Sequence, residues 1–377
     1  MVTVGIICEY NPLHNGHAKQ LRLLRERFGD DCRIVCLMSG NYVQRGEPAV
    51  FDKQIRAKAA IACGADAVLE LPLQYALSSA EGFAAGGVHI LTELGIEWLC
   101  FGSETGDGNL LMSTAEALLQ PQIDEGIRTA LQQGISYAAA REQALSAIYP
   151  EGAALLHSPN DILAVEYCKA VLRQSSRMKI CPILRQGDYH SEAPDTDNPS
   201  ATALRLLLAQ NADISAYVPA AAATEYVEAT QHTMAAGERA LLARLKSMTE
   251  AEFSAAPYGS EGLWRRFMRN CRDCNEISSV VAQTKTKRYA ETRIRRMLLC
   301  AFLGITETDL QRPAEYVRIL AFSDAGREVL RSFRGSSIPV IGVTKKRRNS
   351  QYFSLETHCE SLYFLFERDF SAETQKK

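Results

Sequence analysis

The stretch VTVGIICEYNPLHNGHAKQLRLLRERFG, residues 2–29, decides the fold class of this chain. It begins with a short apolar run from Val2 to Cys8, which predicts a buried strand, and a polar segment, 9–15, follows. From Gly16 onward the apolar residues recur with helical spacing, and Gly29 ends the pattern. A strand that passes through a short loop into a helix is the first half of a parallel βαβ unit.

The same alternation of short apolar runs and helical patterns continues to about residue 210. Further strands are expected at 33–38, 67–71, 98–101 and 179–184, and helices at 51–63, 78–94, 161–174 and 200–209, with a helical segment over 108–150. This alternation predicts an α/β fold with a parallel sheet wrapped by helices. Ligands of such sheets bind beyond the carboxyl ends of the strands, so the loop 9–15 is a candidate site.

Charge is divided unevenly along the 377 residues, although the formal net charge is only −2. Residues 1–260 carry a net −10, whereas residues 261–350 carry a net +10. Such asymmetry predicts a segment that binds a polyanion. We therefore expect an α/β domain at 1–225 and a mostly helical, basic C-terminal domain at 226–377. The hydrophobic share of 46 % and the charged share of 23 % exclude a collagen-like, disordered or coiled-coil protein.

The 11 cysteines are odd in number and irregularly spaced. Together with the lack of a signal peptide, this favours reduced thiols and a cytoplasmic protein. Cys271 and Cys274 form the only CxxC pair, and no second ligand pair follows, so no metal site is expected. No apolar run approaches the length of a membrane span, and nothing indicates an obligate protein partner.

The motif His14-Asn15-Gly16-His17 lies between the first strand and the first helix. Gly16 lacks a side chain, so a ribose or purine can lie against the backbone there. The helix start and the two histidines supply hydrogen-bond donors to phosphate oxygens, which gain charge during attack on the α-phosphorus. The alternative is that the two histidines only cap the helix.

This motif resembles the HxGH signature of the nucleotidyltransferase superfamily, which has a Rossmann-like sheet. The whole chain resembles the bacterial tRNA(Met) cytidine acetate ligase family. The resemblance rests on ordered blocks along the chain: GIICEYNPLHNGH (5–17), MSGNYVQRGEPA (38–49), GAD (64–66), ELP (70–72), FGSE (101–104), SPNDIL (158–163) and TKRY (286–289). The block at 38–49 is the most specific, because a generic adenylyltransferase does not carry it.

The resemblance implies an ATP-dependent acetate ligase whose nucleotidyltransferase-like domain, 1–225, binds ATP. It would form acetyl-adenylate and pass the acetyl group to N4 of the wobble cytidine (C34) of elongator tRNA(Met), giving N4-acetylcytidine. ATP would be bound with Mg²⁺, and His14 and His17 would be catalytic. The implied ATP-binding residues are Ile7, Cys8, Glu9, Tyr10, Asn11, Pro12, Leu13, His14, Asn15, Gly16, His17, Ala18, Lys19, Gln20, Gly102, Asn160 and Arg185.

Two further segments are candidates for substrate contacts. Ser200, Thr202 and Arg205 could contact phosphate, although Pro199 departs from the superfamily's Ile-Ser-Ser-x-x-x-Arg pattern. The loop 39–48 is a candidate lid or acetate and cytidine pocket, and the alternative is a polar connection that only shapes the wall. Its candidate binding residues are Asn41, Gln44 and Arg45.

Basic residues cluster within residues 285–296, where they could neutralise tRNA phosphates. They are Lys285, Lys287, Arg288, Arg293, Arg295 and Arg296. Earlier and later basic rows lie at 265–272 and 345–348, and Trp264 and Tyr289 offer stacking faces. A solvated charged face is the alternative interpretation of these rows.

Two other functions remain open from the sequence. The first is an adenylyltransferase that acts on a small metabolite. The second is a non-catalytic RNA-binding protein that keeps a remnant nucleotide fold. Acetate-dependent exchange of pyrophosphate into ATP separates the first from an acetate ligase. Loss of exchange with retained tRNA affinity in a His17→Ala variant excludes the second.

Overall fold

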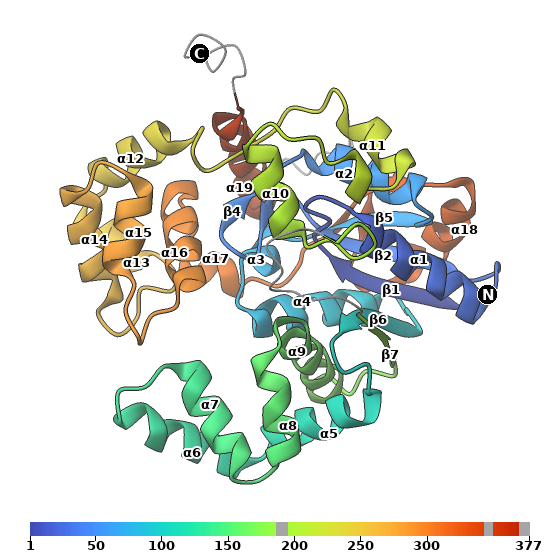
Figure 1. Cartoon of the computed structure of the whole chain (residues 1–377), viewed down its shortest axis with the longest axis horizontal. Coiled ribbons are helices and arrows are strands. Elements are labelled where there is room, and N and C mark those ends of the chain that lie inside the picture. Colours follow the sequence, from blue (N-terminus) through green and yellow to red (C-terminus); the bar gives the residue numbers. More distant parts are fainter. Residues whose placement is uncertain (186–194, 343–349, 369–377) are drawn as a thin grey trace.

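The computed structural model describes residues 1–185, 195–342 and 350–368. Its centre is a seven-stranded sheet with the order β7-β6-β1-β2-β5-β8-β9 (Figure 1). The strands are β1 (Thr3–Cys8), β2 (Arg33–Ser39), β5 (Ala67–Leu71), β6 (Trp98–Ser103), β7 (Lys179–Leu184), β8 (Val317–Phe322) and β9 (Val340–Ile341). The first five run parallel to one another, which confirms the expected α/β class.

Alternation along the strands builds a hydrophobic core on each face of the sheet. In β2, Val35 and Leu37 join one core, whereas Ile34 and Cys36 join the other. Both faces are therefore covered, which explains why these strands are continuous apolar runs. One core contains residues of α4 (Ala80–Glu93) and α9 (Pro159–Arg173), and the other contains residues of α1 (Asn15–Phe28), α2 (Lys53–Ala62), α10 (Ala201–Ala209) and α11 (Ala220–Tyr226).

The insertion between β6 and β7 is helical, as its sequence predicts. Its first helix packs against α9, and the helices that follow pack in turn on that helix or on one another, below the sheet in the view of Figure 1. They are α5 (Gly108–Leu118), α6 (Pro121–Gln132), α7 (Tyr137–Ser146) and α8 (Pro150–Ala154).

A second group of helices gathers at the other side of the molecule around a separate core (Figure 1). These helices are α12 (Glu238–Ser247), α13 (Glu250–Ala255), α14 (Leu263–Asp273), α15 (Ile277–Thr284) and α16 (Glu291–Leu303). The short helices α3 (Leu73–Ala76) and α17 (Glu307–Gln311) follow β5 and α16. The chain then returns to the sheet through β8, α18 (Asp324–Ser332) and β9, and α19 (Gln351–Tyr363) follows.

The return of the chain to the sheet was not predicted from the sequence. β8 pairs antiparallel with β5, and β9 pairs parallel with β8, so residues beyond 226 extend the sheet of the N-terminal part. The domain boundary at residue 225 stays a prediction, but strands from both sides of that boundary belong to the same sheet. The loop 39–48 also contains a small antiparallel hairpin of β3 (Tyr42–Val43) and β4 (Glu47–Pro48).

All 11 cysteines are free thiols. Cys271 and Cys274 are buried in the core of the second helical group. Within the described residues, no group of three or more His, Cys, Asp or Glu side chains is placed to hold a metal ion. No helix in the same part of the chain has both the length and the apolar character that crossing a membrane requires.

Candidate nucleotide-binding site

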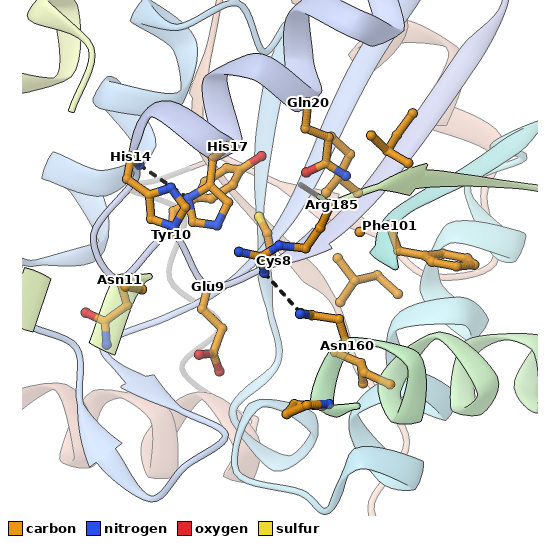
Figure 2. A pocket seen from close by; sticks show the side chains of 18 of the residues that line it. Cys8, Glu9, Tyr10, Asn11, His14, His17, Gln20, Phe101, Asn160 and Arg185 are labelled. Carbon is orange, nitrogen blue, oxygen red and sulfur yellow. Dashed lines mark hydrogen bonds between the residues drawn. The ribbon is translucent and has the colours of Figure 1, made fainter. Parts of the chain in front are cut away.

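A cavity of about 340 Å³ opens at the carboxyl ends of β1, β6 and β7. The loop after β1 and the start of α1 form one wall, and Asn160 and Arg185 contribute to another (Figure 2). Gly102 also lines the cavity. The strand order places the neighbours β7, β6 and β1 side by side, so segments almost 180 residues apart in sequence meet here. The site lies where a parallel sheet is expected to bind its ligand.

His14 and His17 form a stacked pair at the start of α1. Their ring centroids lie 3.7 Å apart with an interplanar angle of 23°. His14 is the residue before the first turn, and its backbone N–H donates to His17 Nδ1 at 3.3 Å. Because His17 Nδ1 accepts, this network assigns the ring proton to Nε2, which remains available as a donor.

Both imidazoles are neutral at pH 7. Burial lowers the pKa of His17 to about 3, with a smaller contribution from the positive charge of Arg185. Burial, followed by His17 and Arg185, also holds the pKa of His14 well below its usual range. In the absence of an anion the pair therefore consists of neutral N–H donors rather than of two cations.

Arg185 is positioned by a chain of hydrogen bonds from β6 and α9. Its Nη1 donates to Asn160 Oδ1 at 3.2 Å, and Asn160 Nδ2 donates to Glu104 Oε1 at 2.6 Å. The aliphatic part of Arg185 packs on Gly102, where an added Cβ would lie 3.1 Å from Arg185 Cδ. Glu104 is a positioning residue that sequence reasoning did not assign to the site, although it lies in the block FGSE.

Helix α10 brings one of the three predicted phosphate contacts to the cavity. Arg205 lines it, and its Nη1 donates to Asn11 O at 2.8 Å. Ser200 instead caps α10 by accepting a hydrogen bond from Ala203 N at 3.1 Å, and Thr202 Oγ1 lies 3.3 Å from Arg205 Nη2. Neither Ser200 nor Thr202 lines the cavity as described.

The hairpin β3–β4 contributes Gln44 and Arg45 to the cavity wall. Gln44 N donates to Glu9 Oε1 at 2.8 Å, which fastens the hairpin to the end of β1. Asn41 does not line this cavity, because its Oδ1 accepts a hydrogen bond from Lys53 N at 2.9 Å at the start of α2. Its observed role is to hold the loop in place.

Most of the predicted ATP-binding segment, residues 7–20, lines the cavity. Four of its residues do not line the cavity: Pro12, Leu13, Asn15 and Ala18. Several apolar lining residues were not assigned from the sequence, among them Phe83, Phe101, Leu163, Tyr167 and Ile183. Their apolar spacing is the same as that of core residues, so only the fold distinguishes them.

The predicted tRNA-binding residues divide into two groups. Arg295 pairs with Glu47 at 3.1 Å, and Arg296 Nη1 donates to Gln44 O at 3.1 Å, so both hold α16 against the hairpin. Arg293 Nε donates to Tyr258 O at 2.9 Å.

Lys285, Lys287 and Arg288 are exposed, although Lys285 pairs with Glu291 and Arg288 with Glu261. The basic row at 345–348 lies outside the described residues.

The chain matches the family model of the HIGH Nucleotidyl Transferase along residues 1–377, in agreement with the fold and the cavity. A crystal structure of Thermotoga maritima TmcAL bound with alpha-thio ATP superposes with a TM-score of 0.88 at 29 % identity, over 98 % of this chain and 96 % of that one. The apo form of TmcAL gives a TM-score of 0.91 at 28 % identity, with the same coverage.

Curated relatives are more similar in sequence. The tRNA(Met) cytidine acetate ligase of Clostridium acetobutylicum is 34 % identical over 98 % of this chain and 96 % of its own length. The enzyme of the same name from Clostridium kluyveri is 36 % identical, over 93 % of this chain and 91 % of its own length. The chain therefore belongs to the tRNA(Met) cytidine acetate ligase family.

Proposed function

We propose that this protein is an ATP-dependent ligase that activates acetate as acetyl-adenylate and acetylates N4 of the wobble cytidine of elongator tRNA(Met). The observation that carries the proposal is the cavity in which His14, His17 and Arg185 converge on one space at the carboxyl ends of the strands. The names of the curated relatives and the ATP analogue bound by the Thermotoga protein support the same function.

The first step joins acetate to the α-phosphorus of ATP and releases pyrophosphate. Charge grows on the α-phosphate oxygens during attack, and the N–H donors of His14 and His17 with the cation Arg185 stabilise that charge. No general base is needed, because acetate is already ionised at neutral pH. Lys19 and Arg205 line the same cavity and supply further positive charge for the leaving pyrophosphate.

The second step transfers the acetyl group from the mixed anhydride to the cytosine amine. This amine is a weak nucleophile, so alignment beside the acetyl carbon supplies much of the rate. Gln44 and Arg45 line the cavity from the hairpin and are the proposed contacts to acetate or cytidine. The exposed cations Lys285, Lys287 and Arg288 are the proposed contacts to tRNA phosphates.

The donor set does not form a protein-held Mg²⁺ site. Glu9 is the one carboxylate among the described residues that line the cavity, and protein Mg²⁺ sites depend on carboxylate oxygens. Mg²⁺ that accompanies ATP would therefore be bound by phosphate and water oxygens, and no step is derived through it.

The function is tested by two measurements on the full chain. Exchange of labelled pyrophosphate into ATP should depend on acetate, and labelled acetate should enter elongator tRNA(Met) at N4 of the wobble cytidine. Exchange that depends on a different metabolite, with unlabelled tRNA, would favour a metabolite adenylyltransferase. Binding of tRNA without any exchange would favour a non-catalytic RNA-binding protein.

A further inference from the structure

Glu9 is the one acidic residue among the described residues that line the cavity. The remaining charged side chains that line it are cations, namely Lys19, Arg45, Arg185 and Arg205. Cations attract a triphosphate, whereas a carboxylate repels one. The adenylation step derived above makes no use of Glu9, so this carboxylate needs a separate explanation.

The position of Glu9 leaves one carboxylate oxygen for a ligand. Oε1 accepts the hydrogen bond from Gln44 N at 2.8 Å, and it is the only oxygen of this group that accepts one from a described residue. In Figure 2 the carboxyl group points away from the imidazole rings of His14 and His17. Glu9 therefore directs its charge away from the histidines that hold the α-phosphate and toward the hairpin side.

Attachment of the hairpin does not by itself require a carboxylate. A side-chain amide oxygen accepts a hydrogen bond from Gln44 N equally well, and it avoids the repulsion of ATP. The neighbouring Tyr167 cannot supply a base, because burial together with Cys8 and Glu9 holds the pKa of its hydroxyl well above its usual range. The Tyr167 hydroxyl therefore stays protonated, whereas the Glu9 carboxylate beside it can accept a proton.

We propose that Glu9 binds the amine of the target cytosine and accepts its proton during acetyl transfer. The proposal rests on the proposed function. N4 donates a hydrogen bond to Oε2 and attacks the acetyl carbonyl carbon of acetyl-adenylate. The N–C bond forms, the C–O bond to the phosphate breaks, and AMP leaves with the bonding electron pair. The N4 proton passes to Oε2 and from there to water.

The chemistry of the amine supports this assignment. A carboxylate is the side chain that proteins use to accept a hydrogen bond from cytosine N4. Burial raises the pKa of Glu9, while the hydrogen bond from Gln44 and the charges of Arg205, Arg45 and Arg56 lower it, and the net shift is upward. A carboxylate with a raised pKa is the better proton acceptor at neutral pH.

The decisive variant is Glu9→Gln, which keeps the acceptor for Gln44 N and removes the base. Acetate-dependent pyrophosphate exchange without tRNA is compared with single-turnover transfer from preformed acetyl-adenylate to tRNA(Met). We expect transfer to fall at least about 100-fold further than exchange does, the usual contribution of a general base. Glu97→Gln is the matched control, because Glu97 contacts Thr3 at the opposite end of the sheet and should leave both rates unchanged.

Two results would overturn the role of Glu9. One is transfer that survives in Glu9→Gln, and the other is an equal loss of exchange and transfer in a folded variant, which would place Glu9 in the ATP site. If Glu9→Gln does not fold, the pH profile of transfer in the unmodified protein decides. The rate of transfer should fall as the pH is lowered, with the profile of one ionising group whose pKa lies above the usual range of a carboxylate. A flat profile contradicts the proposal.

The failure of this inference is distinct from the failure of the proposed function. If the unmodified protein neither exchanges pyrophosphate with acetate nor acetylates tRNA, the proposed function itself is wrong. If it does both and Glu9→Gln does so at the same rates, only the role of Glu9 is wrong.

Discussion

Replacing Arg296 by alanine should impair the adenylation site even when tRNA is absent. Arg296 lies on α16, in the part of the chain that its charge assigned to tRNA, but its Nη1 donates to Gln44 O at 3.1 Å. Gln44 lines the cavity and donates to Glu9 through its backbone. One side chain on the second helical group therefore holds the hairpin that forms a wall of the nucleotide site.

The expected magnitude follows from two contacts. A hydrogen bond from a charged donor contributes about 1.5–3 kcal/mol. The guanidinium also lies 5.1 Å from the centroid of the Tyr258 ring, a cation–π contact of about 0.5–1 kcal/mol. If Arg296→Ala removes about 2 kcal/mol of the stabilisation that holds the hairpin in its observed position, the exchange rate falls roughly 30-fold, since 1.4 kcal/mol is a factor of ten.

The assay is acetate-dependent pyrophosphate exchange without tRNA, paired with tRNA binding measured by filter retention. The matched control is Arg288→Ala, because Arg288 is an exposed cation near the same helix and pairs with Glu261 rather than with the hairpin. Arg288→Ala should keep full exchange and bind tRNA less tightly.

The opposite pattern would refute the reasoning. If Arg296→Ala exchanges pyrophosphate at the normal rate and loses only tRNA affinity, Arg296 is a tRNA contact and the hairpin does not depend on it. An independent perturbation is Gly46→Ala, since Gly46 has φ +77° and an added Cβ would lie 2.5 Å from the carbonyl carbon of Arg295. It should reduce exchange in the same way.

Four further outcomes are expected. His17→Ala should lower pyrophosphate exchange by about 10²–10³-fold with unchanged circular dichroism, as for loss of one donor to a transition-state oxyanion. Because burial lowers the pKa of His17 to about 3 in the folded state against about 6.5 when unfolded, the unfolded chain binds the extra proton between these values. The free energy of unfolding, measured by urea denaturation, should therefore fall as the pH decreases from 6.5 to 3. It should fall less steeply in His17→Ala. Arg56→Met should lower the free energy of unfolding in urea by about 3–5 kcal/mol, since Arg56 is fully buried and donates to several backbone carbonyl oxygens, those of Phe51 and Glu9 among them, which would lose their donor; a loss below about 1 kcal/mol would contradict this. Lys287→Ala should weaken tRNA binding and reduce the slope of log K against log salt concentration by about one, whereas an unchanged slope would exclude a phosphate contact.

Local sequence patterns predicted the α/β part of the fold. The strands at 67–71 and 179–184 have the predicted bounds, and α1 begins within one residue of its prediction. These elements are readable because burial on both faces requires uninterrupted apolar runs, and because an amphipathic helix repeats every 3.6 residues. The motif at 14–17 was recognisable for the same reason, since it occupies the junction between two such elements.

Long-range pairing could not be read in this way. β8 and β9 join the edge of a sheet whose other strands all come from residues 3–184. The residues of a strand do not specify which other strand it pairs with. The hairpin strands β3 and β4 have two residues each, too few to produce a periodic pattern.

The sequence by itself determined the class of sheet, the position of the histidine motif and the existence of a basic segment. Apolar periodicity and charge along the chain are local properties, and they survive without a fold. Only the tertiary structure decided which way each side chain points. It directs Arg295 and Arg296 to the hairpin and leaves Lys287 exposed, and it brings Phe83 and Tyr167 into the cavity wall. These assignments depend on how distant elements pack against one another, and composition does not contain that information.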